Sequence, residues 1–306
     1  MRVVTYNIRY GWGLDHKVDL ARIAAAVHGA DIIALQEVER YWQHSGMADQ
    51  PARLSELLSD YYWAYGPAFD VDASTKGEDG RILNRRRQFG TMLLSKRPIR
   101  ASRLMVLPKI PQPHQFNLDT GALECILDSD LGPLRVYSLH LGSLSAEERL
   151  RQVEMLLARH RSLTPRDGPW TGDGQSDDPG EREQFQLCNW SNGEQLLDMP
   201  LSGLWLGDFN CEPDSAEYDR MVGPAPDGKD GDGTVRLVDS WTQVTIKNRD
   251  EEEATWRPDP PGRAPGRAMR LDYCFVTADL AGRVCDAWID QTANGSDHRP
   301  YWVNLI

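Results

Sequence analysis

Several side chains that could bind a metal ion or move a proton lie along the whole sequence, most of them directly after short apolar runs. In one example, the run Leu204-Trp205-Leu206 leads through Gly207 to Asp208. An apolar run that stops at a glycine is typical of a buried strand that ends at a sheet edge. We therefore expect strands to bring these side chains to one edge. The set is Asn7, Glu37, His140, Asp208, Asn210, Asp272, Asp297 and His298.

Carboxylate and amide oxygens dominate this set, and they favour a hard cation such as Mg²⁺ or Mn²⁺, whereas zinc would require more His or Cys ligands. A histidine beside a carboxylate, as in Asp297-His298, can act as a base next to a metal ligand. Asp272 is available to fix the tautomer of an imidazole. Any one of these residues alone would be read as a solvated turn residue, so the repetition is what indicates a site.

The elements that must position these residues begin with a strand ending at Asn7, a helix over about 15–27 and a strand ending at Glu37. This order predicts an α/β arrangement at the start of the chain. Pro51 opens a second helix. A long amphipathic helix is predicted from Ser145 to Leu163, with Ser145 as its cap and Glu148 completing a capping box.

Four further strands are predicted over 89–95, 103–107, 122–128 and 134–140, and the Gly132-Pro133 turn makes the last two a hairpin. Residues 65–88 show no clear hydrophobic periodicity, and three consecutive arginines, Arg85, Arg86 and Arg87, lie near the end of this segment. Three consecutive arginines are typical of a solvated loop. Because a strand follows them, they could instead overhang the site and bind a phosphate through bidentate hydrogen bonds.

Polar, glycine-rich segments interrupt the pattern at 164–193, 223–233 and 259–266. We interpret the first as an inserted loop or partly disordered segment, because the strands on either side belong to one sheet. The candidate site residues are spread from Asn7 to His298 and make sense only if they converge. The sequence therefore predicts one domain over residues 1–306.

The composition of this 306-residue chain, 40% hydrophobic with a formal net charge of −12, allows a large core and argues against a protein that coats nucleic acid. It does not exclude a nuclease. The five cysteines show no metal-ligand spacing, which favours reduced thiols in a cytoplasmic protein. The sequence contains no apolar stretch of membrane-spanning length, and we expect no signal peptide, because a candidate site residue follows as early as Asn7.

Taken together, six short motifs resemble the endonuclease/exonuclease/phosphatase superfamily, which includes deoxyribonuclease I-like nucleases and neutral sphingomyelinases. They occur in the order of that family, and the resemblance covers essentially the whole chain. The motifs are Thr5-Tyr6-Asn7-Ile8-Arg9, Leu35-Gln36-Glu37-Val38, Ser138-Leu139-His140-Leu141, Gly207-Asp208-Phe209-Asn210, Arg270-Leu271-Asp272-Tyr273 and Ser296-Asp297-His298-Arg299-Pro300.

The resemblance implies an α+β fold, a four-layer αββα sandwich in which two mixed sheets pack face to face with helices outside. It implies that Glu37 is the main metal ligand, with Asn7 and Asp297 near the same cation or a second one. It also implies that Asp208 and Asn210 orient the attacking water and hold the phosphate.

For the histidines, the resemblance implies that His298, supported by Asp272, is a general base or phosphate-binding group. His140 corresponds to a histidine that stabilises phosphate charge or assists the leaving group. The chain departs from the family pattern at Thr120, where many members have Arg, and in the length of the 164–193 insert. Both departures lie where substrate choice would be decided.

Three functions remain open from the sequence. The first is a Mg²⁺-dependent phosphodiesterase or phosphatase that acts on a small or lipid-derived phosphoester. The second is a DNA or RNA nuclease with the same site, in which the arginine cluster contacts the backbone. The third is a binding module that has lost catalysis, which the intact set of site residues disfavours.

Overall fold

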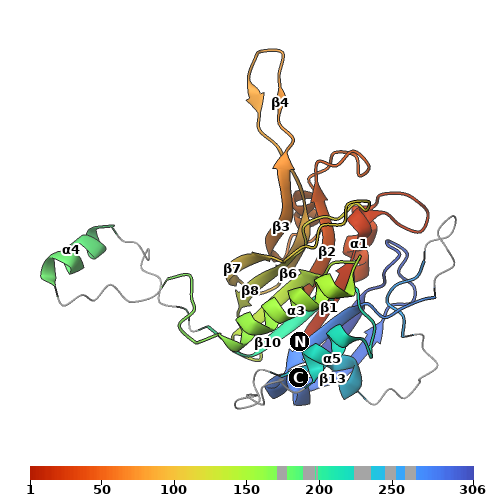
Figure 1. Ribbon diagram of the computed structural model, residues 1–306. Helices are drawn as coiled ribbons and strands as arrows, with labels where there is room; N and C mark the ends of the chain where they lie inside the picture. Colours follow the sequence, from red (N-terminus) through yellow and green to blue (C-terminus); the bar gives the residue numbers. More distant parts are fainter. Residues whose placement is uncertain (171–177, 189–196, 198, 224–235, 245–252, 259–266) are drawn as a thin grey trace.

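The computed structural model describes residues 1–170, 178–188, 197, 199–223, 236–244, 253–258 and 267–306. The strands of its body form two large mixed sheets (Figure 1). The first is six-stranded in the order β13-β14-β1-β2-β6-β3. Its strands are β1 (Arg2–Asn7), β2 (Ile32–Arg40), β3 (Tyr62–Asp72), β6 (Arg86–Ser95), β13 (Val284–Ile289) and β14 (Tyr301–Leu305).

The second sheet is also six-stranded, in the order β11-β12-β10-β9-β8-β7. Within each sheet one neighbouring pair is parallel, β1 with β2 and β9 with β10, and the other pairs are antiparallel. A short hairpin of β4 (Thr75–Lys76) and β5 (Ile82–Leu83) projects beyond β3 and β6 (Figure 1). The strands of the second sheet are β7 (Ile99–Val106), β8 (Gly121–Leu127), β9 (Leu134–His140), β10 (Gly203–Asp208), β11 (Leu237–Asp239) and β12 (Asp272–Thr277).

Helices cover the outer face of each sheet. One apolar cluster joins β1, β2 and β6 to α1 (Leu20–Val27) and α2 (Gln50–Leu57). Another joins β9, β10 and β12 to α3 (Ala146–Arg161) and α5 (Ala216–Val222). The four layers are thus helices, sheet, sheet and helices, which confirms the predicted αββα sandwich. The remaining helices are α4 (Pro179–Cys188) and the 3₁₀ segments η1 (Arg9–Gly11), η2 (Ser240–Gln243) and η3 (Ala278–Arg283).

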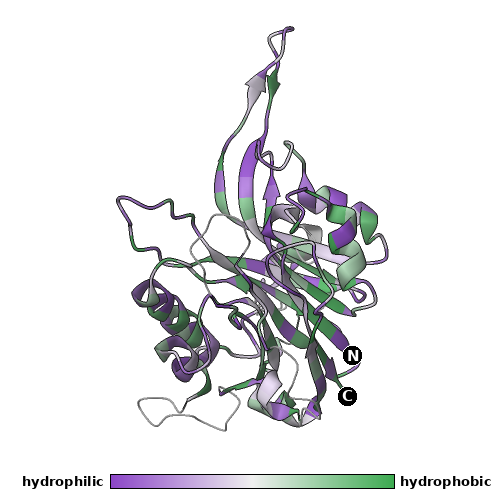
Figure 2. Ribbon diagram, turned by 90° about the vertical axis from the view of Figure 1, so that its right-hand side faces the viewer, coloured by the Kyte–Doolittle hydropathy of each residue, from purple (hydrophilic) through white to green (hydrophobic). Residues whose placement is uncertain are grey.

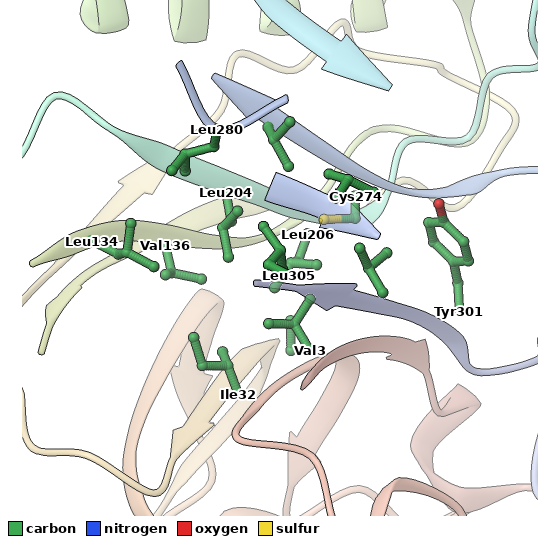
Figure 3. Packing of buried hydrophobic residues seen from close by; sticks show 14 of the residues in the cluster. Val3, Ile32, Leu134, Val136, Leu204, Leu206, Cys274, Leu280, Tyr301 and Leu305 are labelled. Carbon is green, nitrogen blue, oxygen red and sulfur yellow. The ribbon is translucent and has the colours of Figure 1, made fainter. Parts of the chain in front are cut away.

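The central core lies between the two sheets (Figure 3). Val3 and Ile32 of the first sheet face Val136 and Leu204 of the second, and all four are at most 1% exposed. Each buried aliphatic side chain contributes about 1.5–3 kcal/mol through removal of apolar area from water. This packing fixes the distance between the sheets and therefore between residues at their common edge.

Along the inner faces, apolar side chains give way to polar ones before the strands reach that edge. Thr5 Oγ1 donates to Gln36 Oε1 at 3.3 Å, and Gln36 Nε2 donates to Ser138 Oγ at 3.3 Å. All three side chains are fully buried. Since Gln36 and Ser138 belong to opposite sheets, this network joins the sheets directly below the ends of the strands.

The predicted helices form, with shifts at their ends. α1 begins at Leu20 rather than near residue 15, because the Asp19 side chain accepts hydrogen bonds from the backbone N–H groups of Ala21 and Arg22. Ser145 caps α3 as predicted. Glu148 does not return to the cap, as a complete capping box would require.

The sequence prediction was wrong for residues 65–72, which lie in β3. This edge strand has few buried side chains, and its register shifts between Pro67 and Phe69, so no alternation is visible in its sequence. Its far end is largely hydrophilic, and apolar residues concentrate in the body (Figure 2). The projecting hairpin carries the exposed apolar pair Ile82 and Leu83 on β5. Arg86 and Arg87 belong to β6 and not to a loop.

The described part of the predicted 164–193 insert contains the helix α4, where only a loop was expected. Its other residues, 171–177 and 189–193, lie outside the described residues, as do most of 223–233 and all of 259–266. In the described part of the chain, no helix combines the length and the apolar character needed to span a membrane.

Candidate active site

Three of the predicted site residues are direct neighbours across the second sheet. In the register of the strands, Asp208 at the end of β10 lies opposite His140 of β9 on one side and Asp272 of β12 on the other. Asn7 ends β1 in the facing sheet, and its Nδ2 donates to Asp208 Oδ2 at 2.9 Å. The inward alternation of each strand therefore brings residues from both sheets to one place.

A bulge in β2 turns Glu37 toward the same place. Leu35 pairs with Met92 and Val38 with Gly90, so β2 has one residue more than β6 in this interval. Glu37 adopts a left-handed backbone with φ of 58°. Leu35 and Val38 both pack under the helices on the outer face of the sheet. Glu37 points to the site instead, where its Oε1 accepts a hydrogen bond from Asn7 Nδ2 at 3.1 Å. The extra residue re-aims a side chain that strict alternation would direct outward.

Asp272 holds the imidazole of His298. His298 Nδ1 lies 2.8 Å from Asp272 Oδ2, and His298 Nε2 lies 3.7 Å from Asp208 Oδ2. His140 Nε2 approaches the same Asp208 oxygen at 3.5 Å. Asp272 is fully buried, and its backbone N–H donates to Thr255 Oγ1 at 3.0 Å. The carboxylate thus fixes the ring of His298 so that Nε2 faces Asp208.

Burial and the neighbouring charges shift the pKa values of these groups in opposite directions. Burial raises the pKa of Asp208, although His298 and His140 partly oppose this effect. For His298, burial lowers the pKa, but the nearby Asp272 and Asp208 carboxylates outweigh it and raise the pKa to about 10. The Asp272 and Asp208 carboxylates and the His298 and His140 imidazoles thus lie close enough for the charge of each to influence the protonation of the others.

Two more predicted residues border this group. Asn210 has φ of 50°, its backbone N–H donates to Asp208 Oδ1 at 2.9 Å, and its Nδ2 donates to the Leu141 carbonyl. Asp297 Oδ2 accepts from Trp256 Nε1 at 3.3 Å and lies 3.7 Å from Arg9 Nη1. Asn210 therefore has its amide oxygen available, and Asp297 lies close to a positive charge.

A cavity of about 510 Å³ opens over these residues. Six of the predicted residues line it, whereas Asn7 and Asp272 are completely buried. The lining residues include Arg9, Tyr10, Glu37, Glu39, Trp42, His44, Phe89, Phe116, Asn117, Thr120, His140, Asp208, Asn210, Trp256, Asp297 and His298. Thr120, which replaces the arginine of many family members, is therefore part of the wall.

The arginine cluster does not line this cavity. Arg86 Nε forms an ion pair with Asp70 Oδ1 at 2.7 Å on the neighbouring strand. Arg87 Nε donates to the Tyr41 carbonyl at 3.2 Å, and the Arg85 guanidinium lies 5.1 Å from the centre of the Tyr41 ring. The Arg87 guanidinium also lies 5.9 Å from the ring centre of Trp42, which does line the cavity. The structure thus brings the other predicted site residues together but leaves these three arginines outside the cavity lining.

Sequence reasoning missed several residues of the wall, among them Tyr10, Glu39, Trp42 and His44. Glu39 is particularly unusual, because burial raises the pKa of its carboxyl to about 8 against the opposing effect of the Ser45 hydroxyl. The one available signal was position, since Glu39 follows Glu37 by two residues on the same strand. Tyr10 and Trp42 show no sequence pattern that distinguishes a cavity-lining aromatic residue from one in the core.

The chemistry of the cavity fits a divalent cation. Glu37, Asp208 and Asp297 offer carboxylate oxygens, and Asn210 offers an amide oxygen, which are donors that Mg²⁺ and Mn²⁺ prefer. Ligand atoms of Asp208, Asp272 and His298 lie within 4.8 Å of one another, and the buried Asp272 Oδ1 has no hydrogen-bond partner among the described residues. Glu37 and Asp297 line the same cavity outside this cluster. The acidic groups are therefore distributed along the cavity wall and are not gathered at a single point.

This fold and site define a class of enzymes in which two packed sheets present carboxylates and histidines at one edge. The model of the endonuclease/exonuclease/phosphatase family matches residues 4–298, and the chain belongs to this family. It is a phosphoester hydrolase, and enzymes of this family depend on divalent metal ions. No curated protein matches the sequence.

Solved structures with the same fold cover the whole of this chain. A family protein from Beutenbergia cavernae is 20% identical, with a TM-score of 0.59 over 71% of its own chain. The mannosyl-6-phosphatase Bt3783 from Bacteroides thetaiotaomicron is 17% identical, with a TM-score of 0.56 over 99% of its chain. Truncated TDP2 from Caenorhabditis elegans is 18% identical, with a TM-score of 0.57 over 96% of its chain.

Proposed function

We propose that the chain, as one domain over residues 1–306, is a Mg²⁺- or Mn²⁺-dependent hydrolase of a small or lipid-derived phosphoester. The observation that carries this proposal is the convergence at one cavity of the Asp272–His298 pair, Asp208 and the Asn7–Glu37 pair. These groups come from both sheets and from both ends of the sequence. Such a set can bind a cation, orient water and contact a phosphate.

In this proposal Glu37 and Asp297 hold the cation, and Asn7 positions Glu37 through its Nδ2 hydrogen bond. When bound, the cation neutralises charge that develops on phosphate oxygens. Asp208 is placed to orient the attacking water, because its carboxylate is flanked by His140 and His298. The two imidazoles can donate hydrogen bonds to the phosphate and to the leaving oxygen.

The walls of the cavity favour a compact substrate over a nucleic acid. Among the cavity-lining residues that the structure describes, Arg9 is the one Arg or Lys, and Glu39 adds a carboxyl to the wall. A polynucleotide requires several cationic contacts along its backbone, and the Arg86 side chain that could provide one is paired with Asp70. The structural neighbour Bt3783, a mannosyl-6-phosphatase, is compatible with a small phosphoester as the substrate.

A direct experiment compares hydrolysis of p-nitrophenyl phosphate and bis-p-nitrophenyl phosphate by the wild type with and without Mg²⁺ or Mn²⁺. We expect turnover of one or both substrates, with abolition by EDTA and recovery on adding back the metal. Plasmid nicking measured in parallel tests the nuclease alternative. Metal-independent turnover, or no turnover of any phosphoester, would contradict the proposal.

Two substitutions connect the activity to the site. Glu37→Gln and Asp297→Asn are expected to raise the metal concentration that gives half-maximal activity, since each replaces a charged ligand with a neutral one of the same shape. Glu56→Gln is a matched control, because Glu56 is an exposed carboxylate on α2 that pairs with Arg53. Equal metal dependence in all three variants would contradict the assignment of the ligands.

A further inference from the structure

The cavity contains a second imidazole–carboxyl pair that the phosphate chemistry does not use. His44 Nε2 lies 3.1 Å from Glu39 Oε2, and both residues line the cavity that also contains His298 and Asp208. The His44 side chain is 47% exposed and the Glu39 side chain is 1% exposed. His44 therefore presents its ring to the cavity while Glu39 lies behind it and holds it.

The buried carboxyl of Glu39 is expected to lower the stability of the fold. A buried carboxyl lowers stability unless its oxygens are hydrogen-bonded, and Glu39 Oε1 has no hydrogen-bond partner among the residues described. Its backbone N–H donates to Gln50 Oε1 at 3.1 Å, which fixes the strand at this point. A buried polar residue that lowers stability and lines a cavity is expected to be kept for its function.

Hydrogen bonds through Gln50 connect Glu39 on β2 to the segment that carries Tyr10. The buried Gln50 donates through Nε2 to the Tyr10 carbonyl at 2.7 Å, so it joins Tyr10 to Glu39. Arg9 and Tyr10 both adopt positive φ, of 45° and 47°, a strained conformation that is common at functional sites. The Tyr10 ring centre lies 4.5 Å from that of His44.

The Trp42 ring centre lies 5.5 Å from that of His44. The imidazole thus contacts two aromatic rings and is hydrogen-bonded to the buried Glu39. Because Trp42 and Tyr10 also line the cavity, aromatic surface adjoins the polar edge of His44. This combination of one fixed polar group and aromatic walls is that of a binding subsite.

We propose that His44, positioned by Glu39, binds a hydroxyl group on the organic part of the phosphoester, which makes hydroxylated phosphoesters of the polyol or sugar class the preferred substrates. This inference rests on the proposed phosphoester hydrolysis and adds the substrate class. A hydroxyl group both donates and accepts, so it satisfies the free ring nitrogen in either tautomer of His44. A second phosphate group is disfavoured, because it would lie beside the carboxyl of Glu39.

The test uses two substrates that differ only in hydroxyl groups, glycerol 1-phosphate and propyl phosphate, or their p-nitrophenyl diesters if only diesters are hydrolysed. The measured quantity is the ratio of their kcat/KM values with saturating Mn²⁺. We expect the wild type to prefer the glycerol compound and His44→Phe to lower this ratio about tenfold, the usual worth of one hydrogen bond. Phenylalanine keeps an aromatic ring in contact with Tyr10 and Trp42 but cannot form the hydrogen bond.

Two variants of Glu39 separate positioning from charge. Glu39→Gln can still hydrogen-bond His44 and is expected to keep most of the preference, whereas Glu39→Met cannot and is expected to lose it. If Glu39 acted through its charge, the Gln and Met variants would lose the preference equally, which would overturn the assigned role. Glu56→Gln, which changes an exposed carboxylate, is expected to keep the wild-type ratio.

The outcomes distinguish this inference from the function on which it rests. No metal-dependent turnover of any phosphoester by the wild type would refute the hydrolase proposal itself. Turnover without a preference for the glycerol compound, or an unchanged preference in folded His44→Phe, would refute only the subsite. Circular dichroism checks folding, and Glu39→Met provides the same test if His44→Phe does not fold.

Discussion

Replacing Asp272 by Asn tests how the site holds its central histidine. Asn has the same shape and keeps the backbone hydrogen bond to Thr255, but its uncharged amide oxygen is a weaker acceptor for His298 Nδ1 than a carboxylate oxygen. Instead the amide nitrogen can donate to Nδ1, which favours the opposite tautomer of the ring. The fold should therefore survive while Nε2, which faces Asp208 at 3.7 Å, presents the wrong hydrogen-bonding character.

The expected loss follows from the bond that is removed. A hydrogen bond to a charged group contributes about 1.5–3 kcal/mol, which corresponds to roughly 10–150-fold in rate. Loss of a correctly placed proton donor or acceptor costs about 10²–10⁴-fold. We therefore expect Asp272→Asn to lower kcat by about 10²–10³-fold, with a much smaller change in KM.

The assay is steady-state hydrolysis of the best chromogenic phosphoester at saturating Mn²⁺, with ¹⁵N chemical shifts of the His298 ring as an independent measure of its tautomer. His160 provides a matched control because it is a buried histidine that packs on Trp205 away from the cavity, and its ring shifts should not change. A folded Asp272→Asn variant within about threefold of wild-type kcat would refute the assigned role, since even one weakened charged bond exceeds that factor.

Three further predictions concern residues outside this group. Arg86→Ala should change kcat/KM less than twofold, because Arg86 pairs with Asp70 outside the cavity; a loss above about tenfold would show that it contacts substrate. Arg135→Ala should lower the free energy of unfolding in urea by about 3–5 kcal/mol, because it leaves the buried Glu124 without its fully buried partner, and a loss below about 1 kcal/mol would contradict this. Burial raises the pKa of Cys274 to about 12, so the unfolded thiol ionises near pH 9 while the folded thiol does not. Stability should therefore be complete below pH 9 and fall by up to about 1.4 kcal/mol per pH unit from this group between pH 9 and 12. Cys274→Ala should reduce that slope in urea unfolding, and an identical slope would contradict the pKa shift.

The layers of the fold were predictable because the strands that form them end in recognisable motifs. Apolar runs before Asn7, His140 and Asp208 indicated buried strands, and the order of the motifs indicated the sandwich. β3 was not predictable, because an edge strand with few buried residues lacks a hydrophobic alternation. The sequence also could not indicate that β2 contains a bulge at Glu37, because the extra residue depends on pairing with a distant strand.

The site was predictable to the extent that its residues end strands, as Asn7, His140 and Asp208 do, or stand beside such ends. Glu37, predicted to end its strand, lies within β2. The wall of the cavity was not predictable, because Tyr10, Trp42 and His44 come from turns whose path depends on tertiary contacts such as the one from Gln50. The arginine cluster illustrates the opposite error. Consecutive charges near a strand end suggested a phosphate clamp, but the partner of Arg86 lies on β3, the strand that the sequence did not reveal.

The central claim is that Glu37 and Asp297 bind a divalent cation, at the edge where the two sheets meet, and that hydrolysis requires this cation. Isothermal titration of Mn²⁺ into the wild type and into the Glu37→Gln variant, with phosphoester turnover measured on the same samples, tests this claim most directly. We expect saturable binding by the wild type, affinity at least tenfold weaker in the variant, and a parallel loss of turnover. Equal Mn²⁺ affinity in the two proteins, or full turnover by the variant at low Mn²⁺, would contradict the claim.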